Sequence, residues 1–383
     1  MSTVTSWNIE RVWGEDNFYN DGDIAEDKYA FVIDSGVTKL DDLNINEQWS
    51  KSFLSHSLDQ DPFEDFISHG TAVASIIGAK NNNEGLVGVA PGTQIVSLKV
   101  FGQYSTTNTS TVEAALLHAK EVILENNLQD KAVINMSLSS SKAAFEIVEE
   151  MASLGIRFSV SAGNSYGDVN QRWPAQYGYL ENVYTASSID NDDYMSNFSS
   201  FDDDDGRDDV DYASPGGAAY SYKNDGSIGT FSGTSFSAPH LAGLVLLGGM
   251  KSDGFTLFRK SARNSHQKNA VADPIAVLDY DKLAPKVFTG TDGRDQYNGW
   301  RFDDIINTGT GKDKVSGGDG ADTFVLNKGY KFCKIMDYDS SMDVLALPEG
   351  DLTIKVKSNK DIIKLYVDDD LIAKINGTDA LIV

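Results

Sequence analysis

The sequence predicts an α/β fold, with a mostly parallel sheet and helices on both faces, followed by a small all-β domain. Two observations support this prediction. Through the first two thirds of the chain, short apolar runs of strand length alternate with longer runs at helical spacing, which is typical of βαβ units. After residue 282 the composition changes, and aspartates recur every nine residues. We therefore expect two domains, at residues 1–282 and 283–383.

The composition limits the classes of partner. With 383 residues, of which 40% are hydrophobic, the chain can bury a sizeable core. Its net charge of −25 argues against nucleic acid and anionic membranes as partners. The longest apolar run, residues 241–250, is about half a membrane span, so stable membrane insertion is not expected. The single cysteine, Cys333, allows no intrachain disulfide.

The first predicted strand, residues 29–33, is a short apolar run that ends at Asp34. Ser35 and Gly36 then turn the chain. A carboxylate at the carboxyl end of a buried parallel strand lies at the edge of the sheet where α/β proteins carry their sites. Aspartate after a strand is also a common turn former, so the residue alone leaves both roles open.

The following elements continue the alternation. A helix of small and apolar residues is predicted at 69–78, and it begins at His69. Strands are predicted at 94–100, 131–138 and 157–162. An amphipathic helix at 111–126 has an apolar face formed by Val112, Ala115, Leu116, Ala119, Val122 and Ile123. A lone histidine in an apolar helix is commonly structural, so His69 alone does not indicate a site.

Ser235 lies where a small-residue turn leads into a helix. The β-like run 228–231 precedes the turn, and the apolar run 241–247 follows it. Backbone N–H groups and the helix dipole both point at a residue in this position. That environment suits a nucleophile whose reaction develops an oxyanion. It also suits a serine that only caps the helix.

Three segments together resemble the motifs of subtilisin-like serine proteases: Asp34-Ser35-Gly36, His69-Gly70-Thr71 and residues 233–240, GTSFSAPH. They occur in the chain order Asp, His, Ser of that family, and the resemblance covers roughly residues 5–280. It implies a subtilisin-like fold and a serine endopeptidase that acts on proteins or peptides through an acyl-enzyme. Ser235 would attack the carbonyl, His69 would move the proton, and Asp34 would orient His69. The alternative is a catalytically silent domain that serves as a calcium-dependent surface or adhesive module.

The same resemblance implies further site residues. Asn164 matches the amide of the oxyanion hole. The segments that match the substrate-binding strand and pocket wall comprise Ser137, Leu138, Ser139, Ala162, Gly163 and Arg172. Arg172 stands immediately before Trp173-Pro174-Ala175, which resembles the wall of the primary pocket. A guanidinium there would favour an acidic residue before the cleaved bond. Alternatively, Arg172 faces solvent or pairs with Asp168.

Two segments of the first domain are candidates for calcium. Residues 81–91 resemble the loop that holds the family's tightly bound calcium, and Asp42 and Asn82 match its side-chain ligands. The alternative for this loop is a solvated, asparagine-rich turn. The acidic insert at 202–209 is either a solvated loop or an additional calcium site.

The last third carries a nine-residue repeat. Its aspartates are Asp295, Asp304, Asp313 and Asp322, and an apolar residue follows two positions after each. Gly293, Gly311 and Gly320 precede three of these aspartates by two positions. The period resembles the repeat of RTX calcium-binding β-rolls. In such a roll, glycine allows a tight turn of inward carbonyls, aspartate supplies charged oxygen, and the apolar residue packs in a thin core.

The chain end completes this expectation. Residues 332–347 and 352–383 read as short strands that resemble the closing sheet of RTX proteins exported by type I secretion. That machinery reads an uncleaved C-terminal address, and the apolar residues 380–383 are compatible with one. The N-terminus shows no pattern of a cleavable signal peptide. We therefore expect a secreted or cell-surface protein, with Ca²⁺ as cofactor and the type I secretion machinery as a possible partner.

Overall fold

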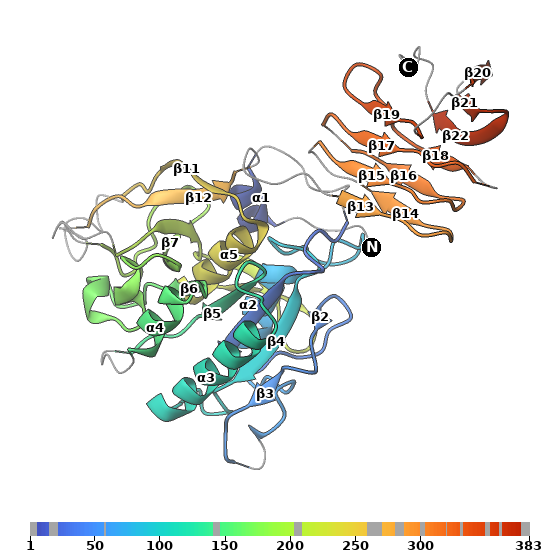
Figure 1. Ribbon diagram of the computed structural model, residues 1–383. Helices are drawn as coiled ribbons and strands as arrows, with labels where there is room; N and C mark the ends of the chain where they lie inside the picture. Colours follow the sequence, from blue (N-terminus) through green and yellow to red (C-terminus); the bar gives the residue numbers. More distant parts are fainter. Residues whose placement is uncertain are drawn as a thin grey trace. The chain divides into compact units, whose positions relative to one another are not determined.

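The computed structural model divides the chain into two compact units, residues 1–282 and 283–383 (Figure 1). It describes residues 6–14, 22–56, 59–140, 146–202, 209–258, 270–279, 287–298, 303–318, 320–329, 332–348, 353–359 and 362–376. The centre of the acidic insert, residues 203–208, and the chain end, residues 377–383, lie outside the described residues. Each unit is built around its own core, and we describe them separately.

The first unit is organised around a ten-stranded sheet. Its strands pair in parallel except at one edge, where β11 runs antiparallel to β12. The prediction of a mostly parallel sheet is therefore confirmed. The strand order is β11 (Met250–Phe255), β12 (Pro274–Leu278), β8 (Tyr212–Pro215), β7 (Val183–Ile189), β6 (Phe158–Ser161), β5 (Ala132–Met136), β1 (Tyr29–Asp34), β4 (Gln94–Lys99) and β2 (Asn44–Ile45), with β3 (Lys51–Ser52) also on β4.

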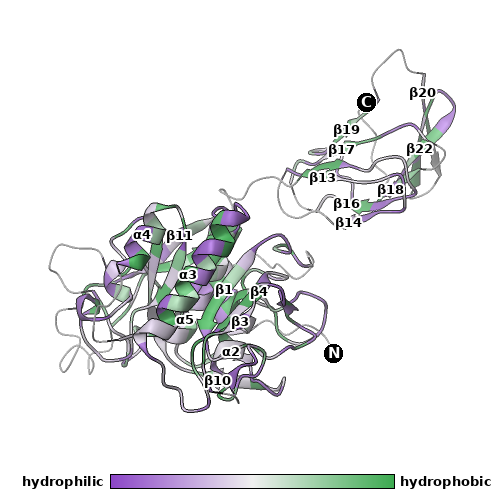
Figure 2. Cartoon of the chain, turned by 60° about the horizontal axis from the view of Figure 1, so that its bottom comes forward, coloured by the Kyte–Doolittle hydropathy of each residue, from purple (hydrophilic) through white to green (hydrophobic). Residues whose placement is uncertain are grey.

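Helices cover both faces of this sheet because its strands are apolar on both sides. Phe31 and Ile33 of β1 pack in one core with helices α3 (Thr109–Glu125) and α4 (Ile147–Ser153). Ala30 and Val32, which alternate with them, pack in a second core with α2 (His69–Gly78) and α5 (Thr234–Leu247). Figure 2 shows the difference between the layers: α3 carries both hydrophilic and hydrophobic residues, whereas α5 is largely apolar. A further helix, α1 (Trp7–Trp13), begins the described chain.

The strand order brings three chain segments to one edge of the sheet. β1 lies between β4 and β5, and β6 follows β5. The carboxyl ends of β1, β5 and β6 lead to Asp34, Ser137 and Ala162, respectively. A short antiparallel hairpin, β9 (Ala219–Tyr222) and β10 (Ile228–Phe231), leads into α5. Parallel pairing therefore gathers residues far apart in sequence where α/β proteins form their sites.

The second unit contains two sheets. One consists of four parallel strands, β13 (Val287–Thr289), β15 (Ile305–Asn307), β17 (Thr323–Val325) and β19 (Val344–Ala346). The other pairs β14 (Gln296–Asn298), β16 (Lys314–Ser316), β18 (Cys333–Ile335) and β22 (Asp370–Asn376) in parallel, and β21 (Ile362–Val367) and β20 (Ile354–Asn359) complete it in antiparallel pairing. The described part of this unit is all-β.

The nine-residue period has a structural cause in this unit. Successive strands from β13 to β19 alternate between the two sheets, so Ile306 pairs with Phe324, eighteen positions later. Ile306, Val315 and Phe324 are fully buried in the core, as expected for the apolar position of each repeat, and Tyr297 is half-buried against them. One residue per repeat therefore fills the space between two thin sheets. Among the described residues, no helix is long and apolar enough to cross a membrane.

Candidate functional site

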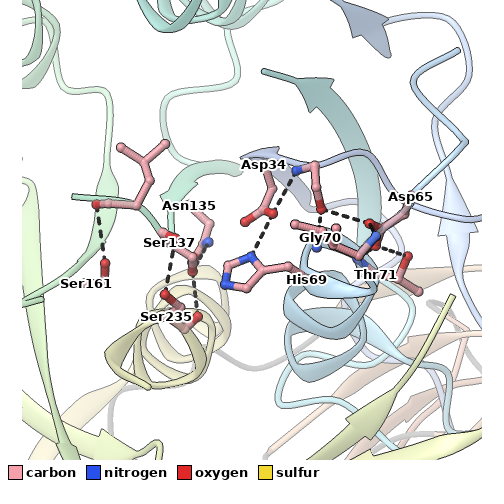
Figure 3. A network of polar contacts seen from close by, with 12 residues as sticks. Asp34, Asp65, His69, Gly70, Thr71, Asn135, Ser137, Ser161 and Ser235 are labelled. Carbon is pink, nitrogen blue, oxygen red and sulfur yellow. Dashed lines mark hydrogen bonds and ion pairs between the residues drawn. The ribbon is translucent and has the colours of Figure 1, made fainter. Parts of the chain in front are cut away.

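Asp34 and His69 form a close pair at the carboxyl end of β1. Asp34 is buried at the end of the strand, and its Oδ1 accepts the Ser35 N–H at 2.7 Å. His69 is the first residue of α2, and its Nδ1 lies 2.8 Å from the same oxygen. Figure 3 shows the imidazole between the Asp34 carboxylate and Ser235. The aspartate therefore fixes Nδ1 as the protonated nitrogen and leaves Nε2 facing the serine side.

The electrostatic environment favours a protonated His69. Burial by itself lowers the pKa of this imidazole, but the charge of Asp34 and its hydrogen bond outweigh burial and raise the pKa above the usual value. Asp65 adds a smaller effect in the same direction. A positive charge that forms on His69 during a reaction is therefore stabilised where it forms.

Ser235 is the second residue of α5. Gly233, directly before the helix, has φ +149°, a backbone conformation that a side chain at this position would disfavour. The Ser235 Oγ donates to the Ser137 carbonyl at 3.3 Å, and the Ser137 Oγ donates to the Ser235 carbonyl at 2.6 Å. These two bonds tie the start of α5 to the segment that follows β5. The serine hydroxyl is thus placed beside His69 at a helix N-terminus, as the sequence predicts.

The Asn164 side chain is oriented by Thr234. Its Oδ1 accepts both the Thr234 N–H at 2.9 Å and the Thr234 hydroxyl at 3.1 Å. Its amide nitrogen consequently points away from Thr234, and a Cβ on Gly233 would lie 3.3 Å from that nitrogen. Asn164 is exposed. This arrangement presents an N–H donor beside Ser235, where an oxyanion would develop.

Asp65 is a buried residue of this site that the sequence analysis missed. Its carboxylate accepts hydrogen bonds from the Ser35 hydroxyl at 2.9 Å and from the Thr71 N–H and hydroxyl at 2.9 and 2.7 Å. The Ser35 hydroxyl in turn accepts the Gly70 N–H at 2.9 Å. Asp65 therefore joins the turn after β1 to the first turn of α2 (Figure 3). The available signal was an acidic residue four positions before a helix that begins with His-Gly-Thr.

The predicted substrate-binding segments converge next to Ser235. The Ser161 Oγ donates to the Leu138 carbonyl at 3.4 Å, which ties the end of β6 to the segment after β5. Ser140 and Trp173 exchange two backbone hydrogen bonds, at 2.8 and 2.9 Å. Leu138 is half-buried and Ser139 is exposed at this edge. Hydrogen bonds thus link the segments after β5 and β6 and the segment at Trp173 to one another.

The other predicted members of these walls lie in the turn that leads to Asn164. Ala162 is buried, and its N–H donates to the Ala186 carbonyl at 3.0 Å. The Gly163 N–H donates to the Thr234 hydroxyl at 3.0 Å. Arg172 packs its aliphatic stem over Gly163.

A cavity of about 380 Å³ borders the Leu138–Ser139 segment. Helix α3 and the loop before it contribute one wall, and the opposite wall is formed by the segment after β5 together with Trp173. Its lining consists of Phe101, Ser105, Thr106, Thr107, Asn108, Thr109, Val112, Leu138, Ser139, Ser140 and Trp173. The mixed apolar and hydroxyl lining could hold a further substrate side chain.

Asp42 and Asn82 lie together, as the sequence predicts, but protein groups already occupy their oxygens. The Asp42 Oδ1 accepts the Asn82 side-chain N–H at 2.8 Å, and its Oδ2 accepts the Tyr222 hydroxyl at 2.6 Å. The Asn82 oxygen accepts the Glu84 N–H at 2.9 Å, and the Tyr222 hydroxyl accepts the Leu86 N–H at 2.7 Å. Asn82 thus turns its NH₂ group, and not its oxygen, toward Asp42. This arrangement does not fit a calcium site, which needs convergent oxygens.

We call these hydrogen bonds of Tyr222 with Asp42 and Leu86 the Tyr222 clasp. Tyr222 is buried at the end of β9, in the hairpin that leads to α5, whereas Asp42 and Leu86 flank α2. Desolvation and the hydrogen bond to Asp42 raise the pKa of Tyr222, so the hydroxyl keeps its proton. A Cβ at Gly85 would lie 1.7 Å from the hydroxyl oxygen, so this close approach requires glycine. The clasp connects the segments that carry His69 and Ser235.

His240 has a structural role in α5. It is fully buried, its Nδ1 lies 2.7 Å from the Phe236 carbonyl, and its Nε2 lies 3.0 Å from the Asn8 side chain. Burial lowers the pKa of His240 to about 4. A neutral imidazole therefore links α1 to α5 and takes no part in the site.

The repeat aspartates lie in rows in the second unit. The Asp295 N–H donates to Asp313 at 3.0 Å, and the Asp304 N–H donates to Asp322 at 2.8 Å. The Asp322 N–H donates to Asp343 at 3.0 Å. The carboxylates of Asp313, Asp322 and Asp343 therefore each accept the backbone N–H of the preceding aspartate in the same row. Among the described residues of both units, no three His, Cys, Asp or Glu side chains converge on a point where a metal ion could bind.

Asp322 has an oxygen that hydrogen bonding does not satisfy. Its Oδ2 is buried without a hydrogen-bond partner among the described residues. Burial, together with the charges of Asp343, Asp304 and Asp337, raises the pKa of Asp322 to about 7. A Cβ on Gly317 would lie 2.0 Å from this oxygen, so only glycine fits beside it.

In the first unit, the edges of the acidic insert are buried. The Asp209 N–H donates to Asp202 Oδ2 at 3.2 Å, and both side chains are buried. Because residues 203–208 lie outside the described part, the two alternatives for this insert both stand.

The chain matches the model of the subtilase family over residues 31–256, more than half of its length. Subtilisin-like protease 6 of Trichophyton equinum is 31% identical over 256 residues, which cover 64% of this chain and 58% of that protein. Subtilisin E of Bacillus subtilis is 32% identical over 228 residues, which cover 56% of this chain and 54% of that protein. The chain therefore spans somewhat more than half the length of these relatives.

Two solved structures show a similar architecture. A cold-adapted subtilisin-like serine proteinase aligns with a TM-score of 0.50 at 25% identity, covering 70% of this chain and 87% of that one. A protease from Pseudoalteromonas arctica aligns with a TM-score of 0.50 at 22% identity, covering 62% of this chain and 82% of that one. The second likeness supports the fold alone. The predicted subtilisin-like fold of the first unit is confirmed.

Asp34→Asn should lower the pKa of His69, because it removes the charge that most favours the imidazolium. Asp65→Asn should lower it less. NMR titration of the imidazole measures both shifts.

Protonated His69 should stabilise the wild-type fold fully below its ordinary pKa of about 6.5, and this stabilisation should disappear as pH rises through the raised value. The stability difference between wild type and Asp34→Asn should shrink over the same range. An unshifted His69 in Asp34→Asn would contradict the assigned pair.

Tyr222→Phe should lower the free energy of unfolding of the first unit by about 1–3 kcal/mol, because it leaves the buried Leu86 N–H without its acceptor and removes a hydrogen bond from the half-buried Asp42 carboxylate. Urea unfolding in the presence of a chelator measures the effect. Tyr220→Phe, an exposed position on the same strand, is the matched control. Equal stability of the two variants would mean that the clasp contributes nothing.

Proposed function

The chain belongs to the subtilase family, and from this membership we propose that it is a serine endopeptidase acting on proteins or peptides through Asp34, His69 and Ser235. The observation that supports this most is the Asp34–His69 pair, 2.8 Å apart, beside a serine at the start of a helix. The three residues come from separate elements, β1, α2 and α5.

In the proposed reaction, the Ser235 Oγ attacks the substrate carbonyl while His69 Nε2 accepts its proton. Asp34 holds Nδ1 protonated and stabilises the imidazolium that results. His69 then donates the proton to the leaving amine, and water releases the acyl group by the same route in reverse. The bond between the Ser235 hydroxyl and the Ser137 carbonyl would be replaced when substrate enters, since catalytic hydrogen bonds commonly tighten only in the complex.

Asn164 would stabilise the tetrahedral intermediate. Thr234 holds its oxygen, so the NH₂ group is available for the oxyanion without reorientation. A preorganised donor of this kind acts mainly on the transition state. Substrate backbone would add as a further strand along Ser137, Leu138 and Ser139, with Ala162 and Gly163 on the facing wall.

We also propose that calcium binds the second unit. The support is the register of Asp295, Asp304, Asp313 and Asp322, together with the buried, unsatisfied oxygen of Asp322. The aspartates and the carbonyls of the neighbouring turns would hold the ion, as in a β-roll. The ion would neutralise carboxylates that otherwise repel one another. Asp42 and Asn82 are not part of this proposal, because the Tyr222 clasp occupies their oxygens.

The nine-residue repeats of the second unit are the reason to propose export. A roll that folds only with calcium would remain unfolded where calcium is scarce and fold once outside the cell. We therefore propose a secreted or cell-surface protein that leaves by type I secretion through a C-terminal address. Secretion of a reporter fused to residues 283–383, in a host that carries such an exporter, tests the address.

Ser235→Ala should abolish peptide hydrolysis and labelling by a fluorophosphonate probe, because the triad acts as a unit. Asn164→Ala should lower kcat far more than it raises KM. In subtilisin, a member of this family, the loss of such a donor lowers kcat about 10²–10³-fold. A folded wild type that neither reacts with the probe nor cleaves peptides would favour the silent adhesive module.

Calcium should raise the unfolding temperature of the second unit, measured by scanning calorimetry of the full chain. In the presence of a chelator, the unfolding temperature of the second unit should fall as pH rises from about 4 to about 7. The reason is that the raised pKa of Asp322 lets the folded state keep a proton that the unfolded state has lost in this range. Asp322→Asn should reduce the calcium effect and flatten this pH dependence. A transition that calcium does not move would contradict a calcium-binding roll.

A further inference from the structure

Arg172 stands at a fixed point in the wall beside Ser235. It follows the short helix η3 (Val169–Gln171), and its N–H donates to the Val169 carbonyl at 2.8 Å. Its own carbonyl accepts the Gln176 N–H, also at 2.8 Å. The next residue, Trp173, is tied by two backbone bonds to Ser140, in the segment that follows β5. The backbone that presents the Arg172 side chain is therefore held on both sides.

The stem of Arg172 lies against the turn that leads to Asn164. A Cβ built on Gly163 would lie 3.5 Å from the Arg172 Cγ and 3.8 Å from its Cδ. Gly163 has φ +101° and donates its N–H to the Thr234 hydroxyl, next to Ser235. Arg172 thus covers the turn between β6 and the candidate oxyanion donor.

These contacts place Arg172 in one particular substrate subsite. If Ser235 attacks a peptide carbonyl whose oxygen lies at Asn164, the preceding side chain would be directed between three segments of the chain. Those segments are 137–140, 161–164 and 172–173, and the hydrogen bonds described above tie them together. The side chain before the cleaved bond would therefore enter the space that Arg172 borders.

Among the described residues, the guanidinium of Arg172 has no counter-charge. Its Nε is buried without a hydrogen-bond partner, and no described carboxylate lies within ion-pair distance of it. Asp168, the acidic residue nearest in sequence, uses its Oδ1 to accept the Asn170 N–H at 2.8 Å. A buried cationic donor without an acceptor is costly, and a carboxylate supplied by a ligand removes that cost. Carboxylate is also the acceptor that the planar guanidinium pairs with best.

We propose that Arg172 makes this protease selective for an acidic side chain directly before the cleaved bond. This inference rests on the proposed function and names its substrate class. The preference would be local, because the net charge of −25 repels acidic peptides in general. Lysine and arginine at the same substrate position would be rejected by like charge.

The test uses peptides that differ only before the cleaved bond, with Glu, Gln, Phe or Lys. Full-chain enzyme is titrated with a fluorophosphonate probe so that rates refer to active sites. We expect kcat/KM for Glu to exceed that for Gln by about tenfold, with the ratio falling as salt is added. Arg172→Gln should bring the ratio close to one, and Arg172→Lys should keep part of it.

Lys131→Gln is the matched control. It removes the same charge from the exposed residue just before β5, at the strand end opposite Ser137, and should leave the ratio unchanged. A wild-type ratio near one, or a ratio that Arg172→Gln does not move, would overturn the role of Arg172 while hydrolysis of the Gln and Phe peptides upheld the protease. Absence of hydrolysis of every peptide would overturn the proposed function and this inference with it.

Discussion

The geometry of the site depends on the hydrogen bonds that the buried Asp65 carboxylate accepts. Through Ser35 and Thr71 it fixes the turn after β1 relative to the first turn of α2, and these two turns carry Asp34 and His69. A buried carboxylate that accepts this many hydrogen bonds is rigid, because each donor would be costly to leave unpaired. The 2.8 Å contact between Asp34 and His69 therefore depends on the buried residues Ser35, Asp65 and Thr71.

Hydrogen bonds also position Asn164 and Ser235 on the other side of the site. Thr234 sets the rotamer of Asn164 with its backbone and hydroxyl, and Ser137 exchanges hydrogen bonds with Ser235. The parallel sheet brings these segments together, and short polar contacts then set their orientation. Preorganisation of this kind is what allows fixed donors to stabilise developing charge without the cost of reorganising solvent.

The two units satisfy their carboxylates in different ways. In the first unit, Asp42 and Asp65 accept hydrogen bonds from hydroxyl and amide donors of other segments. In the second unit, the Asp322 and Asp343 carboxylates each accept the backbone N–H of the preceding aspartate in the row Asp304, Asp322 and Asp343. Burial and the charges of Asp343, Asp304 and Asp337 raise the pKa of Asp322, which supports the proposed binding of an external cation.

The sequence by itself determined the alternation of strands and helices, the positions of Asp34, His69 and Ser235, and the nine-residue register of the second unit. These are local patterns, since periodicity and short motifs are written within a few residues. The tertiary structure alone decided the contacts of Asp65, the Tyr222 clasp at Asp42, and the absence of a hydrogen-bond partner for the Arg172 Nε among the described residues. Tyr222 and Asp42 are 180 residues apart. Which distant donor satisfies a buried polar group depends on how the chain packs, and no local pattern records it.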